Sequence, residues 1–144
     1  MANTNCNIDN GTPPTMSCGQ VTLNYNDTLT LGIGTGFTNS TTTSITQVNF
    51  YNSVNGGKGP TLKGQWKRQG TYTLPTGISA AASGSGVIFT DTDSGNVDED
   101  YYYNVIATDS TTHGNFTADP ELVVRKRVRP PAARAPRPDI APDA

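Results

Sequence analysis

Five acidic residues fall within the ten positions from Asp91 to Asp100, and this run holds the densest set of possible metal ligands in the chain. Calcium takes about six to eight hard oxygen ligands, which carboxylate and amide side chains can supply from alternating positions. A calcium-binding loop is therefore one hypothesis for this run. Its candidate metal ligands are Asp91, Asp93, Asn96, Asp98 and Asp100.

The run begins like an EF-hand loop but departs from that motif at two decisive positions. The bidentate acid of the motif falls on Tyr102, and Gly95 stands one place too early. These departures exclude an EF-hand and leave two alternatives. The run is either an irregular calcium loop, or a solvated turn whose charges discourage edge pairing and which leads into a buried strand. We favour the turn.

No set of residues for catalysis stands out. The single histidine, His113, falls in "TTHG", which predicts a tight turn rather than a base beside a nucleophile. The chain has no G-x-S-x-G elbow, and paired carboxylates occur only in the acidic run. We therefore predict a protein that is not an enzyme, with no cofactor other than the calcium considered above.

Aromatic residues suggest a second kind of site, because an exposed ring can stack on a sugar. The candidate ligand-binding residues are Trp66 and Tyr102. Strand alternation within "YYY" turns Tyr102 to the face opposite Tyr101 and Tyr103. Two interpretations stay open: a carbohydrate-binding platform, or a core filled by Trp66, Tyr101 and Tyr103 with Tyr102 on the surface. We favour the core.

Two cysteines bracket a short segment near the N-terminus. Cys6 and Cys18 enclose "NIDNGTPPTMS", a stretch whose glycine and prolines predict a loop or an edge. A disulfide across so short a loop is one possibility, and two free thiols in a reducing compartment are the other. Two cysteines without a neighbouring histidine do not make a zinc site.

Composition and periodicity predict the strands that would carry these sites. Charged residues form 15% of the chain against a usual value of about 25%, while Thr, Ser, Asn and Gly are abundant. Apolar residues recur at every second position in several segments, which is typical of strands. Seven or eight short strands are expected, within residues 21–34, 45–54, 63–75, 86–93, 101–109 and 116–128.

Some of these segments carry further expectations. Residues 21–34 form either a hairpin over Asn26 and Asp27 or one strand with a break, and residues 76–86 are small and flexible. The turn signal "NGGKGP" follows residues 45–54, and Gly70 indicates a bulge or bend. Pro120 cannot donate a ladder hydrogen bond, so it indicates an edge or the start of a strand.

The last two strands resemble the closing pair of immunoglobulin-like and fibronectin-III-like domains. The resemblance rests on "YYYNVIATD" followed by "ELVVRKR", and on a tryptophan, Trp66, near mid-chain. It implies an all-β, immunoglobulin-like antiparallel β-sandwich, although the inter-sheet cysteine pair of antibody domains is absent. We expect a loop or edge segment over residues 1–20, the sandwich over 21–128 and a tail over 129–144.

The tail and its basic start suggest a role in assembly. Residues 129–144 contain five prolines and no apolar periodicity, which predicts an extended chain. Six of the ten basic residues lie between Arg125 and Arg137, whereas acids outnumber bases before that stretch. An acidic body makes nucleic acid an unexpected partner. The candidate assembly residues are Arg125, Lys126, Arg127 and Arg129.

Two functions from different classes follow from these patterns. The first is a non-catalytic structural or assembly module that joins copies of itself, or a larger protein assembly, through the sandwich and the C-terminal arm. The alternative is a carbohydrate-binding module for glycans, with or without calcium in the 91–100 run. No apolar run approaches the length of a membrane span, and an extracellular, surface or particle-associated location is favoured over the cytoplasm.

Overall fold

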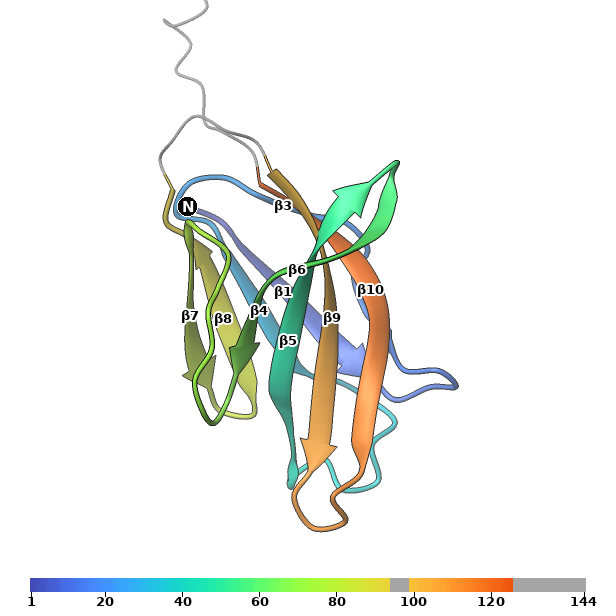
Figure 1. Ribbon diagram of the computed structural model, residues 1–144. Helices are drawn as coiled ribbons and strands as arrows, with labels where there is room; N and C mark the ends of the chain where they lie inside the picture. The colour runs from blue at the N-terminus through green and yellow to red at the C-terminus, as the bar shows by residue number, and fades with distance from the viewer. Residues whose placement is uncertain (94–98, 126–144) are drawn as a thin grey trace, which may run out of the picture.

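The computed structural model describes residues 1–93 and 99–125, and within these ranges the chain forms strands and no helix. The strands make two sheets that pack against each other as a β-sandwich (Figure 1). The all-β prediction is confirmed, and ten strands replace the seven or eight expected. They are β1 (Asn3–Asp9), β2 (Thr15–Met16), β3 (Val21–Leu23), β4 (Thr28–Ile33), β5 (Thr43–Val54), β6 (Gly57–Lys67), β7 (Ile78–Ser83), β8 (Gly86–Asp91), β9 (Glu99–Asp109) and β10 (Asn115–Arg125).

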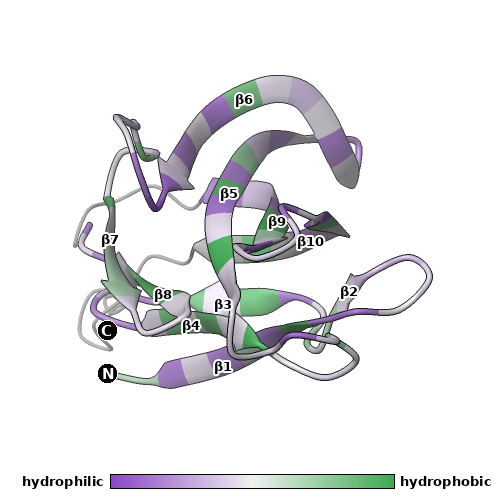
Figure 2. Ribbon diagram, turned by 90° about the horizontal axis from the view of Figure 1, so that it is seen from below, coloured by the Kyte–Doolittle hydropathy of each residue, from purple (hydrophilic) through white to green (hydrophobic). Residues whose placement is uncertain are grey.

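Each sheet has five strands. Sheet A has the order β2-β1-β4-β8-β7, and sheet B has the order β3-β10-β9-β5-β6. Figure 2 looks along the sandwich and shows β1, β4 and β8 in one layer, with β5, β9 and β10 in the other. Apolar side chains from the facing sides of both layers form one core.

Aromatic rings hold the two layers together at the centre of this core. Phe89 of sheet A meets Phe50 of sheet B edge to face, with centroids 5.2 Å apart, and meets Trp66 at 6.5 Å. Phe50 in turn contacts Tyr101 at 6.2 Å and Tyr103 at 6.4 Å. Such edge-to-face contacts add about 0.5–1.5 kcal/mol per pair beyond the buried area.

The period of two predicted for residues 101–109 is confirmed. Tyr101, Tyr103, Val105 and Ala107 are buried along β9, and the residues between them are half-buried on the other face. Trp66 is only 2% exposed, which confirms the preferred interpretation that it belongs to the core.

The prediction for residues 21–34 is wrong in both of its forms. β3 pairs with β10 in sheet B, whereas β4 pairs with β1 and β8 in sheet A, so the chain crosses between the sheets at this point. Asp27 stabilises the crossing because its carboxylate accepts hydrogen bonds from the backbone N–H groups of Asn24 (3.0 Å) and Ala2 (2.8 Å). Burial alone would raise the pKa of Asp27, but these bonds and the N-terminal charge lower it.

The N-terminal segment contributes to the sandwich, although we expected the sandwich to begin at residue 21. β1 lies between β2 and β4, with Cys6 and Ile8 fully buried, while β2 forms the edge. β1 runs parallel to β4, and β3 runs parallel to β10, so the expected uniformly antiparallel arrangement is also wrong. The physical reason is the crossing at Asp27, since a strand pair not joined by a hairpin is free to run in parallel.

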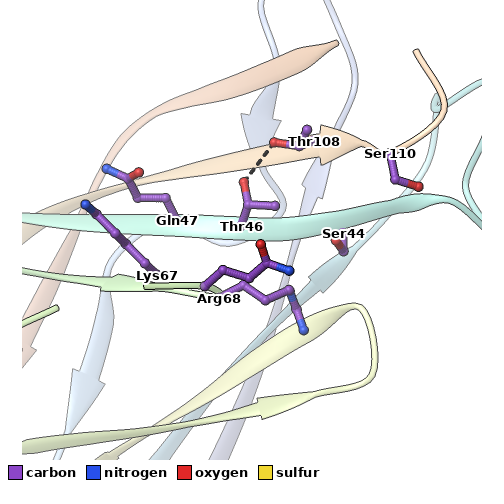
Figure 3. Close-up of a pocket in the computed structure, with 8 residues that line it drawn as sticks. Ser44, Thr46, Gln47, Lys67, Arg68, Thr108 and Ser110 are labelled. Carbon is purple, nitrogen blue, oxygen red and sulfur yellow. Dashed lines mark hydrogen bonds between the residues drawn. The ribbon is translucent and has the colours of Figure 1, made fainter. Parts of the chain in front are cut away.

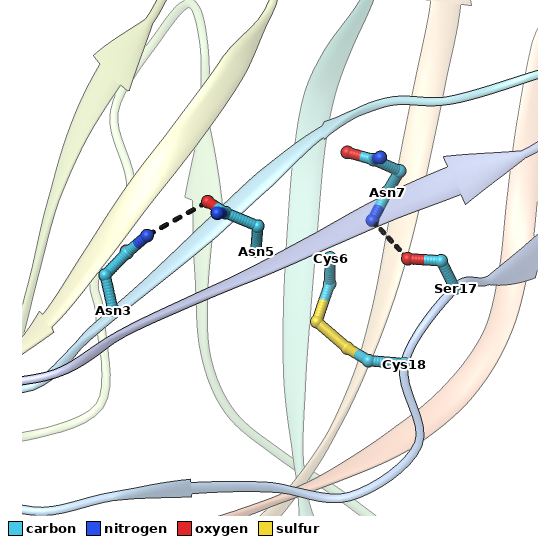
Figure 4. Close-up of a disulfide and its surroundings, with 6 residues drawn as sticks. All are labelled: Asn3, Asn5, Cys6, Asn7, Ser17 and Cys18. Carbon is cyan, nitrogen blue, oxygen red and sulfur yellow. Dashed lines mark hydrogen bonds between the residues drawn. A yellow bond between two sulfur atoms is a disulfide. The ribbon is translucent and has the colours of Figure 1, made fainter.

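A disulfide joins Cys6 of β1 to Cys18 in the loop after β2 (Figure 4). Next to it, the backbone N–H of Asn7 donates to the hydroxyl of Ser17 at 2.8 Å. Of the two alternatives for this pair, the structure has the bond, and it holds residues 10–18, which include the edge strand β2, against β1.

Three smaller expectations have different outcomes. Residues 76–86 contain β7, because pairing with β8 orders a run of alanines and serines that has no strong propensity of its own. Pro120 lies at neither an edge nor a strand start. It falls inside β10, where the register shifts between Ala118 and Glu121, and a bulge tolerates the missing N–H. The turn at Asn55 and Gly56 is confirmed, with positive φ angles of 53° and 78°.

Reduction of the disulfide is expected to lower the free energy of unfolding by about 3 kcal/mol, because the unfolded chain then regains the entropy of a short closed loop. Urea denaturation with and without a reductant measures this difference. The double variant Cys6→Ala/Cys18→Ala serves as the control, since its stability has no reason to respond to reductant. Equal stability of the fully reduced and oxidised wild type would contradict the prediction.

Candidate functional site

The outer face of sheet B carries several polar side chains that could recognise a ligand. Gln47 and Asn49 alternate with buried Val48 and Phe50 along β5. A register shift against β9 falls between Ile45 and Gln47, so β5 has a bulge there. The bulge turns Thr46 outward next to Gln47, because the residues on either side of this pair are buried.

Four carboxamides form a row across three neighbouring strands of this face. The Asn49 oxygen accepts hydrogen bonds from Gln47 (2.8 Å) and from Gln65 of β6 (3.0 Å). The Asn49 nitrogen donates to Asn104 of β9 at 3.1 Å. These residues are called the amide row below. Asn49 is itself buried and its oxygen accepts two hydrogen bonds, so the groups that the row retains for a ligand belong to the half-buried Gln47, Gln65 and Asn104.

A pocket of about 320 Å³ lies at one end of the amide row, where β5, β6 and β9 approach the turns. Figure 3 shows Gln47 and Lys67 on one side of it and Ser44 and Ser110 on the other. The hydroxyls of Thr46 and Thr108 hydrogen-bond to each other at 2.8 Å between them. The pocket is lined by Ser44, Thr46, Gln47, Lys67, Arg68, Gln69, Thr108 and Ser110, and it is called the Lys67 pocket below.

Arg68 forms the wall of the Lys67 pocket and joins the two sheets. Its Nε donates to the carbonyl of Ile45 in sheet B at 2.8 Å. Its Nη1 and Nη2 donate to the carbonyls of Gly84 (3.1 Å) and Gly86 (2.9 Å) at the β7–β8 turn of sheet A. The guanidinium also lies 5.5 Å from the ring centroid of Trp66. Burial lowers the pKa of Arg68 from its ordinary value, but an arginine remains protonated.

Two of the basic residues of the described chain, Lys67 and Arg68, line this pocket. The four that precede Arg125 are Lys58, Lys63, Lys67 and Arg68, and all fall on β6 or one residue after it. The chain as a whole has a formal charge of −2. A ligand that approaches this acidic protein therefore meets its positive charge at β6.

The structure separates the two predicted ligand-binding residues. Tyr102 is half-buried on the outer face of sheet B, and its hydroxyl donates to the carbonyl of Gly56 at 2.7 Å. It lies beside Tyr51, over which the Lys58 ammonium sits at 4.0 Å from the ring centroid. Trp66 cannot serve as a ligand platform because its ring is buried in the core, so its assignment to the ligand site is wrong.

The predicted metal ligands are only partly described. Asp91 is buried at the end of β8, and its carboxylate accepts the N–H of Asp93 at 3.0 Å. Asp100 is exposed at the start of β9. Asn96 and Asp98 lie outside the described residues. Within residues 1–93 and 99–125, no three acidic, histidine or cysteine side chains are grouped so that they could hold a metal ion.

The predicted assembly residues lie at or beyond the end of β10. Arg125 is the last residue of the strand, and its backbone is paired with Leu23 and Glu99. Lys126, Arg127 and Arg129 lie outside the described residues, as does the whole 129–144 tail.

A second polar cluster surrounds Asp109, where β9 ends. Its carboxylate accepts hydrogen bonds from the Asn39 amide (2.8 Å), the Thr111 backbone (2.9 Å) and hydroxyl (2.8 Å), and the Thr42 hydroxyl (2.8 Å). These bonds, that from Asn39 first, hold the pKa of Asp109 well below its usual range. His113 lies in the same turn, as predicted, with a φ of 61°. The cluster ties the loop before β5 to the β9–β10 turn and has a structural role.

Sequence reasoning missed the amide row and the Lys67 pocket. The alternation of Gln47 and Asn49 with Val48 and Phe50 was the available signal, because it places two amides on one face of a strand. The partners Gln65 and Asn104 come from strands whose pairing the sequence does not reveal.

Comparison of the sequence with models of known protein families finds no match, and no curated protein matches it either. Within the residues that the structure describes, no helix is a candidate for crossing a membrane.

The variant Asp109→Asn is expected to lower the midpoint of urea denaturation at neutral pH. A carboxylate with a depressed pKa stabilises the fold above its unfolded pKa of about 3.9, and this contribution is lost as the pH falls through the lower folded value. The stability difference between wild type and variant should therefore shrink below about pH 4. Denaturation curves across this pH range provide the measurement.

Asp100→Asn is the matched control, because this carboxylate is exposed at the other end of β9. If the difference in stability between wild type and Asp109→Asn does not change with pH, the charge of Asp109 contributes nothing to stability.

Proposed function

We propose that this protein is a non-catalytic assembly module built on an immunoglobulin-like sandwich. The strand order supports this architecture. An immunoglobulin sandwich has the sheets ABED and GFC, with a further strand C′ beside C in the variable type. If β1 is A, β4 is B, β5 is C and β6 is C′, the strands β7 to β10 follow as D to G. Apart from the short edge strands β2 and β3, which have no letter in this scheme, both sheet orders then agree with the observed ones.

Three departures limit how far this architecture is shared. β1 runs parallel to β4, where the corresponding strands of an immunoglobulin domain are antiparallel. Trp66 belongs to β6 rather than to β5, the counterpart of strand C. The disulfide joins β1 to the loop after β2 instead of joining the two sheets. The proposed architecture therefore concerns strand order and layering.

The observation that supports assembly is the character of the edge strand β7. Its sequence, ISAAAS, contains no charge and no proline, and it hydrogen-bonds to a neighbouring strand, β8, on one side. Sheet proteins usually protect an edge with charges, prolines or bulges. Ser79, Ala81, Ala82 and Ser83 are exposed, and such small side chains would let another backbone approach closely.

The proposed occupant of this edge is β7 of a second copy. Two identical uncharged strands meet without electrostatic repulsion, and their antiparallel pairing about a two-fold axis closes a dimer. The main-chain hydrogen bonds of such strand addition supply affinity without a deep pocket. The C-terminal arm is a second proposed contact with neighbouring copies. The disulfide supports an extracellular, surface or particle-associated location, because such bonds persist in oxidising compartments.

The variant Ala81→Lys is expected to convert a dimer into a monomer, because a lysine on the edge strand discourages pairing. Size-exclusion chromatography with light scattering measures the mass. Thr117→Lys is the matched control, since it adds the same charge to an exposed position of β10, in the sheet that does not contain β7. A wild-type protein that is monomeric at high concentration would overturn the proposal.

Removal of residues 129–144 tests the contribution of the C-terminal arm. An assembly whose mass in light scattering is unchanged by this removal would exclude the arm from assembly.

Carbohydrate binding is the second candidate function, and the amide row favours it. Carboxamides both donate and accept hydrogen bonds, as sugar hydroxyls do, and four of them are hydrogen-bonded into a row across β6, β5 and β9. Tyr102 and Tyr51 extend the same face with partly exposed rings. Calcium in the 91–100 run remains a separate proposal.

Calorimetric titration with neutral oligosaccharides tests this second function. The variant Asn104→Ala is expected to weaken binding about tenfold, the effect of one or two lost hydrogen bonds. Thr117→Ala, on the neighbouring strand, should leave the affinity unchanged.

If residues 91–100 form a calcium loop, addition of calcium should release or absorb heat in calorimetry and should raise the melting temperature. No heat and an unchanged melting temperature would exclude the metal.

A further inference from the structure

The Lys67 pocket holds two positive charges that no acidic residue of the described chain neutralises. The partners of the Arg68 guanidinium are three carbonyl oxygens and the Trp66 ring. Within residues 1–93 and 99–125, neither Lys67 nor Arg68 is paired with a carboxylate. Three of the five guanidinium N–H groups are used, which leaves two for another acceptor. An anion in this pocket would supply the missing negative charge.

The remaining lining of the pocket is neutral and hydrogen-bonding. Gln47 and Gln69 contribute carboxamides, while Ser44, Ser110 and the Thr46–Thr108 pair contribute hydroxyls. Bare phosphate or sulfate needs donors alone, whereas these groups both donate and accept. They match a ligand that carries hydroxyl groups beside its negative charge.

We propose that the Lys67 pocket binds an acidic sugar, with the carboxylate or sulfate of the sugar at Lys67 and Arg68 and its hydroxyls at the amides and hydroxyls of the lining. This inference rests on the second candidate function, carbohydrate binding, and specifies the substrate class for it. The volume of about 320 Å³ lies at the small end of ligand pockets, about 300–1,000 Å³, which suits a single sugar unit. Longer chains would continue along the amide row from Gln47.

A neighbouring pocket offers a contrast within the same strand. It has a volume of about 500 Å³ and lies between β6 and residues 71–73. Lys63 lines this second pocket but not the first, whereas Lys67 lines both. Arg68 lines the Lys67 pocket but not this second pocket. Substitutions of the two lysines therefore distinguish the two positions.

The experiment is calorimetric titration of the full chain with galacturonic acid oligomers, galactose oligomers of equal length, and inorganic sulfate. The acidic oligomer is expected to bind more tightly than the neutral one, and high salt should weaken the difference because it screens the charges. Lys67→Gln is expected to weaken binding of the acidic oligomer about tenfold, the loss of one charge-assisted hydrogen bond, and to leave the neutral oligomer unaffected.

Lys63→Gln is the matched control, since it removes the same charge from the same strand and should change the affinity little. An equal loss from both variants would place the acid group elsewhere and overturn the assignment to this pocket. Sulfate that binds as tightly as the acidic oligomer would mean a simple anion site and would overturn the sugar. Equal affinity for acidic and neutral oligomers would contradict the preference for an acidic sugar but would still support carbohydrate binding. If neither oligomer binds, both the acidic-sugar inference and carbohydrate binding are wrong.

Discussion

The interaction on which the rest of this fold depends is the contact of the Arg68 guanidinium with three backbone carbonyls. One belongs to Ile45 in sheet B and two belong to the β7–β8 turn in sheet A. The backbone N–H of Ile45 also donates to Ser85 of that turn at 2.7 Å, so the two sheets are joined at one point by side chain and main chain together. A lysine could not replace Arg68, because a point charge lacks the planar fork that reaches three acceptors in different directions.

This contact also explains why the candidate site lies where it does. Carbonyl dipoles stabilise the guanidinium without cancelling its charge, so a net positive field remains at the end of β6. The β5 bulge at Thr46 widens the same region and turns two neighbouring side chains outward. The Arg68 contact that joins the two sheets thus also forms part of the charged, hydroxyl-lined Lys67 pocket on the surface. In the proposed site, Arg68 would serve both stability and ligand recognition, whereas Lys67 would serve recognition alone.

The parts of this molecule that the sequence predicted are those set by neighbouring residues. Alternation identified the inner face of β9, and the Asn55–Gly56 dipeptide identified a hairpin turn, because both depend on local backbone geometry. The crossing at Asp27 depends on a hydrogen bond from Ala2, and the amide row joins Gln65 to Asn104 through Asn49. These arrangements join residues that are far apart in the chain, so no local sequence pattern predicts them. β7 was missed for the same reason, since its order comes from β8.

Both ends of the described chain leave the sandwich from the same pole. The first strand begins beside Thr28, and β10 finishes opposite Glu99, while the Lys67 pocket and the β9–β10 turn lie at the far pole (Figure 1). A ligand would therefore reach the Lys67 pocket from the end of the sandwich that is remote from Asn3, where β1 begins, and from Arg125, where β10 ends.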